Sequence, residues 1–300
     1  MSLNNDSESR LLESLGYKQE FNRRWSGFSN FAVSFSIISV LSGCFTTFGQ
    51  AWNNGGPVAI SIGWPIIAMF ILVIGFCMSE LVSAMPTAGG IYYWAFKLGK
   101  PVHGWITGWL NLVGQFAVTA GVTYGFATFF VTTANLWSDF WDPTDLNQVF
   151  MVFLVAIFLA IALNVWGAKI INLLQNVNVY WHVFGVTAVV LILVFIPTKH
   201  QTLEWMFTTT NNNSGFSTGM YWWYVLPLGF LLTQYTITGF DASAHVSEET
   251  SGASNAAAKG IWQSILFSAI VAGYYYLPSY MPQLMWMQLI RQVDSHQQSS

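Results

Sequence analysis

Charged residues are scarce in this chain: Asp, Glu, Lys and Arg together make up 8% of its 300 residues, against about one quarter in soluble domains. Hydrophobic residues make up 54% and aromatic residues 17%. Such a composition leaves too few polar side chains to cover a soluble surface, and we therefore expect an integral membrane protein. The formal net charge of −3 gives no reason to expect a nucleic-acid partner.

Cysteine is nearly absent as well. The two cysteines, Cys44 and Cys77, fall inside apolar segments, which excludes a disulfide framework and the usual spacing of zinc ligands. The sequence also lacks a phosphate-binding glycine loop and an ordered Ser-His-Asp set, so we expect no metal, no cofactor and no enzyme. Residues 1–27 lack the apolar core of a cleavable signal peptide, and we expect them to form a cytosolic tail.

Long apolar segments dominate the rest. A helix needs about 20 mainly apolar residues to cross a bilayer, and seven segments qualify. We expect them at roughly 28–50, 58–79, 104–133, 148–167, 178–196, 221–245 and 261–281. The predicted fold class is therefore an all-α integral membrane bundle over residues 28–281, followed by a polar tail over 282–300.

The basic residues favour one orientation. With the N-terminus inside, eight basic residues face the cytoplasm and two face outward, as the positive-inside rule requires. The inner set is Arg10, Lys18, Arg23, Arg24, Lys97, Lys100, Lys169 and Lys259, and the outer pair is Lys199 and Arg291. The outer loop 197–220 also contains an N-glycosylation sequon, Asn212-Asn213-Ser214. We expect a multi-pass protein, by default in the plasma membrane, with a cytoplasmic N-terminus.

The first span carries small and polar residues halfway along, in "SGCFTTFG" from Ser42 to Gly49. In hydrocarbon every backbone polar group needs a partner, so an unwound stretch is tolerated only against protein or a water-filled cavity. We expect this helix to open at Ser42-Gly43-Cys44 and to restart near Phe45, where the new N-terminus would attract a carboxylate. The alternative is that these small residues serve only close helix packing.

A second interruption is predicted in span six, at "TQYTITGFD" from Thr233 to Asp241. An ionisable residue such as Asp241 at this depth usually faces a polar interior. The alternative is that Asp241 lies low enough to cap a helix at the cytoplasmic surface. Spans one and six are five spans apart, which is the spacing expected for two inverted five-helix repeats, here 28–196 and an incomplete 221–281.

Five stretches together resemble one known family. They are "NRRWSGFSNFAVSFSIISVLSGCFTTFG", "GGP" at 55–57, "SELVSAMPTAGGIYYW" at 79–94, "GWITGWLN" at 104–111 and "TGFDASAHVSEETSGASNAAAKGI" at 238–261. Over about residues 15–280 the chain resembles the amino acid, polyamine and organocation (APC) transporter superfamily. More narrowly, it resembles the fungal amino acid/choline transporter family, which includes 4-aminobutyrate and choline permeases. The resemblance implies a leucine-transporter-like inverted-repeat bundle.

The resemblance implies a secondary transporter in the lipid bilayer for a small amine-bearing solute, with proton symport as the coupling. It implies that the solute carboxylate binds at the first break and the amine at the second. The implied binding residues are Ser42, Gly43, Cys44 and Phe45 on span one, and Tyr235, Thr238, Gly239 and Phe240 on span six. The implied gating or coupling residues are Glu80, Gly89, Gly90 and Asp241, with an ordinary interfacial connector as the alternative for the loop 86–94.

Other candidates stay open. His182 in span five is either a proton relay or a hydrogen-bonded structural histidine. His245, Glu248 and Glu249 are expected on a solvated face beneath span six. The resembling family has about twelve spans against the seven counted here, so we expect the chain alone to be unstable or inactive. The alternative function is a non-transporting membrane sensor or a regulatory fragment of a permease.

Overall fold

The computed structural model describes residues 9–17, 21–166, 168–196 and 201–275, and within that part all regular secondary structure is helical. The polar tail expected at 282–300 lies outside the described residues. The elements are α2 (Gly27–Ile37), α3 (Val40–Asn53), α4 (Pro57–Ser61), α5 (Gly63–Ala84), α6 (Gly90–Leu98), α7 (Pro101–Asn135), α8 (Leu146–Trp166), α9 (Ala168–Phe195), α10 (Leu203–Thr208), η1 (Thr218–Met220), η2 (Tyr221–Val225), α11 (Leu226–Gly229), α12 (Leu231–Thr236), α13 (Ala242–His245), η3 (Ser247–Glu249) and α14 (Ala253–Tyr275).

Five segments of the described chain are helical, long and apolar enough to cross a membrane: Gly27–Cys44, Pro57–Ala84, Pro101–Asn135, Leu146–Trp166 and Ala253–Gly273. They correspond to five of the seven expected spans. The expected span 178–196 lies within α9, which already begins at Ala168. The expected span 221–245 is divided among η2, α11, α12 and α13. The all-α bundle predicted from composition is confirmed.

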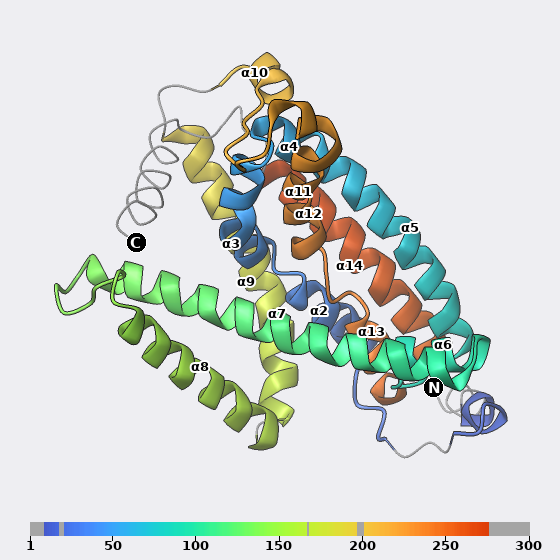
Figure 1. Ribbon diagram of the computed structural model, residues 1–300. Helices are drawn as coiled ribbons and strands as arrows, with labels where there is room; N and C mark the ends of the chain where they lie inside the picture. The colour runs from blue at the N-terminus through green and yellow to red at the C-terminus, as the bar shows by residue number, and fades with distance from the viewer. Residues whose placement is uncertain (1–8, 18–20, 167, 197–200, 276–300) are drawn as a thin grey trace.

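Several of the connections between helices lie at two opposite ends of the bundle, whereas the loop between α7 and α8 lies to one side (Figure 1). At one end the backbone N–H of Trp25 donates to the carbonyl of Glu249, and the N–H of Ser251 donates to the carbonyl of Trp25. The N–H of Ala88, between α5 and α6, donates to the Glu248 carboxylate at the same end. We call this the Trp25 end.

The other end is built around the turn between α3 and α4, and we call it the Gly55 end. The carbonyl of Gly55 accepts hydrogen bonds from the Asn211 N–H and from the Tyr221 hydroxyl. The N–H of Val58 donates to the carbonyl of Thr209 beside it. Span one therefore runs from the Trp25 end to the Gly55 end, and the span formed by α4 and α5 runs back to the Trp25 end.

The core lies between α5 and α14, which run side by side (Figure 1). Gly75 allows this approach, because a side chain there would occupy the position of Ile265. Ser79 donates to the carbonyl of Ala258 at 2.9 Å, so the two helices are also joined by a hydrogen bond. By contrast, α8 is mostly exposed and packs mainly on α7. The exposed apolar side chains of α8 can face lipid at no cost, because lipid tails are as apolar as these side chains.

Candidate functional site

Span one is interrupted at Ile38 and Ser39, between α2 and α3. Ser39 has an extended backbone (φ −79°, ψ 94°), and its hydroxyl accepts the N–H of Ser42 at 3.3 Å, which caps α3. A break in this span was predicted, but its predicted position at Ser42-Gly43-Cys44 is wrong. These three residues and Phe45 belong to the first turns of α3, because the cap begins the helix before them.

Gly43 has a spatial role rather than a conformational one. Its N–H donates to the carbonyl of Ser39 at 2.8 Å, as in an ordinary first helical turn. A Cβ atom at this position would lie 2.7 Å from Oγ1 and 2.9 Å from Cα of Thr236, which is closer than such atoms approach in proteins. The glycine therefore lets α3 touch the end of α12, in agreement with the packing alternative.

Span six is interrupted where the sequence predicted it. Helix α12 ends at Thr236 and α13 begins at Ala242. Between them Gly239 has φ +83°, a conformation that side-chain-bearing residues rarely adopt. A Cβ atom at Gly239 would overlap the side chain of Ile37, the last residue of α2. The two interruptions are therefore in direct contact.

Hydrogen bonds across this contact supply partners for the backbone at the second interruption. The Ser34 hydroxyl of α2 donates to the carbonyl of Phe240 at 2.9 Å, and the N–H of Ser243 donates to the same hydroxyl at 2.9 Å. The Asn30 amide donates to the carbonyl of Ser243 at 3.0 Å. The side chains of Ser34, Asn30 and Ser243 are buried. The hydrogen bonds fasten α2 to α13 and so join spans one and six on the side of the Trp25 end.

Helix α7 also reaches the two interrupted spans. A Cβ atom at Gly121 would lie 3.5 Å from the Tyr235 hydroxyl oxygen, and one at Gly125 would lie 2.7 Å from the methyl group of Thr46. The Thr46 hydroxyl itself donates to the carbonyl of Ser42 at 2.7 Å, within α3. Tyr235 and Ser42 thus lie near a place where three spans converge, and both are half-buried.

The remaining predicted binding residues have different surroundings. The side chain of Cys44 is 1% exposed and packs within the hydrophobic core. Thr238 and Phe240 are half-buried at the second interruption. The side chain of Phe45 lies outside the described part of the structure. Thr238, Gly239 and Phe240 thus lie at the second interruption, whereas Ser42, Gly43, Cys44 and Phe45 lie in the first turns of α3.

At the Trp25 end, two side chains hold the backbone of Ala88 in the predicted gate loop. Glu248 Oε1 accepts the Ala88 N–H at 2.7 Å, and His245 Nδ1 donates to the Ala88 carbonyl at 2.9 Å. Gly90 adopts φ +47°, and a Cβ atom there would lie 3.1 Å from His245 Cε1. Gly89 and Gly90 thus sit in a loop that is clamped onto the segment after span six.

One expectation for this end requires correction, and the capping alternative for Asp241 is not found. Glu248 is only 4% exposed, so the expected solvated face is wrong for this residue, because its carboxylate is committed to Ala88. Asp241 precedes α13 without a capping hydrogen bond. Its Oδ2 instead lies 3.4 Å from His245 Nε2, and Asp241 therefore orients the ring that holds Ala88. Glu80 is exposed on α5.

The N-terminal segment covers the same end. The Tyr93 hydroxyl of α6 donates to the carbonyl of Leu15 at 3.1 Å, and the rings of Tyr17 and Tyr93 meet edge to face at 5.0 Å. Burial, followed by the proximity of Tyr93 and Glu248, raises the pKa of the Tyr17 hydroxyl above its ordinary value. Tyr17 therefore stays neutral at physiological pH beside the Glu248 carboxylate.

His182 is placed against the first interruption. Its Nε2 lies 3.0 Å from the hydroxyl oxygen of Ser39, and its Nδ1 lies 3.1 Å from the carbonyl oxygen of Asn178 one turn earlier on α9. The side chain is 8% exposed. Sequence reasoning missed Ser39 altogether. The signal was present, since a serine directly before an apolar helical run is a common helix cap.

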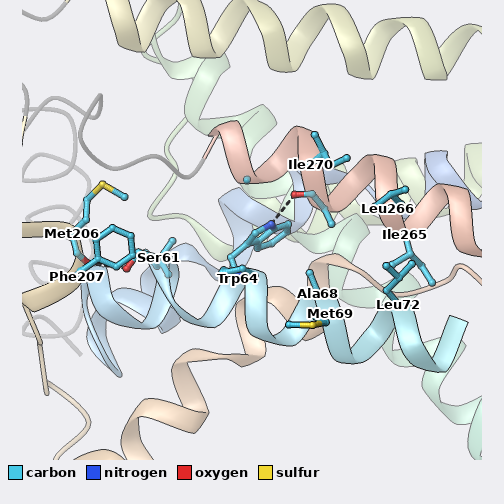
Figure 2. Close-up of a pocket in the computed structure, with 14 residues that line it drawn as sticks. Ser61, Trp64, Ala68, Met69, Leu72, Met206, Phe207, Ile265, Leu266 and Ile270 are labelled. Carbon is cyan, nitrogen blue, oxygen red and sulfur yellow. Dashed lines mark hydrogen bonds between the residues drawn. The ribbon is translucent and has the colours of Figure 1, made fainter. Parts of the chain in front are cut away.

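A cavity of about 530 Å³ lies elsewhere, between α5, α10 and α14 (Figure 2). Its walls are apolar, including Met69, Leu72 and Ile270, and the indole N–H of Trp64 is already bound to the Ala269 carbonyl at 2.9 Å. This cavity offers few groups to bind a charged solute. Within the described residues no cluster of three or more His, Cys, Asp or Glu side chains could hold a metal ion.

A helical membrane bundle in which two discontinuous spans meet at their breaks is the arrangement found in secondary transporters. Residues 26–281 match the family model described as amino acid permease. The chain belongs to this amino acid permease family, and it is accordingly a multi-pass membrane protein. The resemblance to the APC superfamily is confirmed.

Named relatives come from plants and fungi. The chain is 36% identical over 281 residues to the amino-acid permease BAT1 of Arabidopsis thaliana, covering 91% of this chain and 54% of the relative. It is 29% identical to the GABA-specific permease of Saccharomyces cerevisiae (86% and 46% covered). It is 28% identical to the thiamine transporter thi9 of Schizosaccharomyces pombe (89% and 50% covered). The chain thus spans about half the length of these curated relatives. No solved structure matches it.

Proposed function

We propose that this chain supplies the two interrupted spans of the substrate site in a secondary transporter of amino acids or related amines. The observation that carries the proposal is the direct contact of the two breaks, at Ile37 against Gly239 and at Gly43 against Thr236. Half-helix ends at such a junction present backbone dipoles to a charged solute without requiring ionised side chains.

The proposed binding groups follow from the geometry. The solute carboxylate lies at the first turn of α3, beside the half-buried Ser42. The amine lies against carbonyls and polar side chains near Tyr235 and Thr238, between α12 and α13. 4-Aminobutyrate and thiamine, named for two relatives, both contain a positively charged nitrogen. A choline-type solute belongs to the same proposal.

We further propose proton coupling through His182. Its imidazole joins α9 to Ser39 at the first break, so its protonation would change a contact between two spans. A histidine changes charge near neutral pH, which suits a proton carrier. Asp241 belongs to the gate in this proposal, because it orients His245, which in turn holds Ala88. In this proposal the transporter lies in the plasma membrane. The N-terminus and the Trp25 end face the cytoplasm.

Uptake by a reassembled transporter tests the proposal. The chain is expressed in cells lacking amino-acid uptake, alone and together with the half of Arabidopsis BAT1 that it does not match. We expect saturable uptake of a labelled amine-bearing solute only with both halves, and loss of that uptake with Gly43→Leu when variants are compared at equal amounts of protein in the membrane. Uptake that Gly43→Leu leaves intact would remove the proposed site.

The same cells distinguish the transport function from the alternative regulatory function. If the two halves are both present in the membrane yet give no uptake, the transport proposal fails. Co-purification of the chain with a full-length permease whose uptake it alters would then favour the regulatory function. Saturable uptake by the chain alone would instead contradict the expectation that it is inactive without a second half.

A further inference from the structure

Three consecutive asparagines, Asn211 to Asn213, lie in the loop between α10 and η1 at the Gly55 end. The outer two are fastened to the end of α3. The Asn211 amide donates to the carbonyl of Trp52 at 3.1 Å, and the Asn213 N–H donates to the carbonyl of Asn53 at 2.8 Å. The side chain of the middle residue, Asn212, makes its hydrogen bonds within its own turn, to Ser214 and Phe216.

That turn fixes the Asn212 carboxamide. Its Oδ1 accepts the Ser214 hydroxyl at 2.6 Å and the Ser214 N–H at 3.3 Å, which is an Asx turn. Its Nδ2 uses one hydrogen in a bond to the Phe216 carbonyl at 3.1 Å, which leaves the second hydrogen of the amide group. The first and third residues of the sequon are thus held side by side.

The surroundings leave space for a large substituent. Asn212 is half-buried, and its neighbours Asn213, Gly215 and Phe216 are exposed. No heavy atom lies within 4 Å of a Cβ placed at Gly215. The loop belongs to the Gly55 end, opposite the Trp25 end that carries Ala88 and Glu248. In the proposed orientation this is the side away from the cytoplasm, where glycan transfer to N-x-Ser/Thr sequons takes place.

We propose that Asn212 is a site of N-linked glycosylation. In this reaction Nδ2 forms a bond to C1 of an oligosaccharide, the bond from C1 to a lipid-linked pyrophosphate breaks, and the amide nitrogen loses one proton. The co-reactant is a lipid-pyrophosphate-linked oligosaccharide. The site rests on the proposed orientation, because the opposite orientation would place Asn212 in the cytoplasm.

The chain offers a matched control. A second sequon, Asn5-Asp6-Ser7, lies in the N-terminal tail, outside the described residues, and in the proposed orientation it stays cytoplasmic. The full chain, with an N-terminal epitope tag, is synthesised in the presence of sealed rough microsomes. We expect one upward shift in apparent mass, which a glycosidase specific for N-linked glycans reverses. Asn212→Gln and Ser214→Ala abolish the shift, whereas Asn5→Gln and the conservative Ser214→Thr retain it.

Protease added outside the microsomes distinguishes a wrong glycosylation site from a wrong orientation of the chain. A digested tag places the N-terminus on the cytoplasmic side, and an unshifted chain would then overturn the glycosylation site while the orientation stands. A protected tag, with a shift that Asn5→Gln abolishes and Asn212→Gln retains, would overturn the orientation and the site together.

Discussion

Gly43 of α3 faces Thr236 of α12 so closely that a single methyl group would not fit between them. The nearest atoms to a Cβ at Gly43 include the backbone Cα of Thr236, at 2.9 Å, so a rotamer change would not relieve the contact. Because the two residues flank the two interruptions, this contact sets the distance between the two halves of the proposed substrate site.

The first prediction follows from this contact. Gly43→Ala gains about 1 kcal/mol of helix propensity but incurs an overpacking cost of about 1–3 kcal/mol. We expect a lower midpoint of thermal unfolding for the purified chain in detergent. Gly49→Ala is the matched control, since it lies on the same helix with no atom within 4 Å of its Cβ. It should unfold at the wild-type temperature or above, and equal effects of the two substitutions would contradict the contact.

The second prediction separates backbone strain from packing at the second interruption. Gly239 has φ +83° and Gly215 has φ +80°, so alanine at either position costs about 1–2 kcal/mol in the left-handed conformation. Only Gly239 also faces a neighbour, Ile37. We therefore expect Gly239→Ala to lower the unfolding midpoint further than Gly215→Ala and to reduce solute binding in the reassembled transporter. Equal losses of stability would indicate that Ile37 does not press on Gly239.

The sequence located the spans and the second break because both depend on local chemistry. A span needs about 20 mainly apolar residues to cross the bilayer. Gly239, two residues before Asp241, marks a place where a helix tends to end. The first break was placed one turn too late. Gly43 has two physical uses, conformational freedom and space, and only its neighbour Thr236 shows that space is the one used here.

Contacts between distant segments were beyond the sequence. The burial of Glu248 depends on the backbone of Ala88, which lies 160 residues away, and no periodic pattern reports such a partner. His182 was identified as a candidate, but its partner Ser39 on span one was not. In each case the sequence identified one residue of a contact between distant segments. It did not identify the second residue, because the two are brought together only by the folded bundle.

A third prediction concerns the clamp on the gate loop. Glu248→Ala leaves the half-buried Ala88 N–H without its acceptor, which costs up to about 1–3 kcal/mol. We expect faster amide hydrogen exchange in residues 87–90. Glu248→Gln retains an acceptor oxygen and should exchange more slowly than the alanine variant. Glu249→Ala is the control, because the Trp25 N–H binds the Glu249 backbone rather than its side chain. Unchanged exchange in Glu248→Ala would show that the carboxylate does not hold the loop.

The final prediction decides between the two roles left open for His182. Glutamine at this position keeps a polar group near Ser39 but does not titrate, so a proton carrier and a structural histidine give different results. We expect His182→Gln in the reassembled transporter to remove the dependence of uptake on an imposed pH gradient while solute binding persists. His103→Gln, at an exposed position on α7, should leave that dependence unchanged. A purely structural histidine would instead lower the unfolding midpoint of His182→Gln and leave the pH profile of the remaining uptake as in the wild type, because the hydrogen bond to Ser39 would then matter only for packing α9 against the first break.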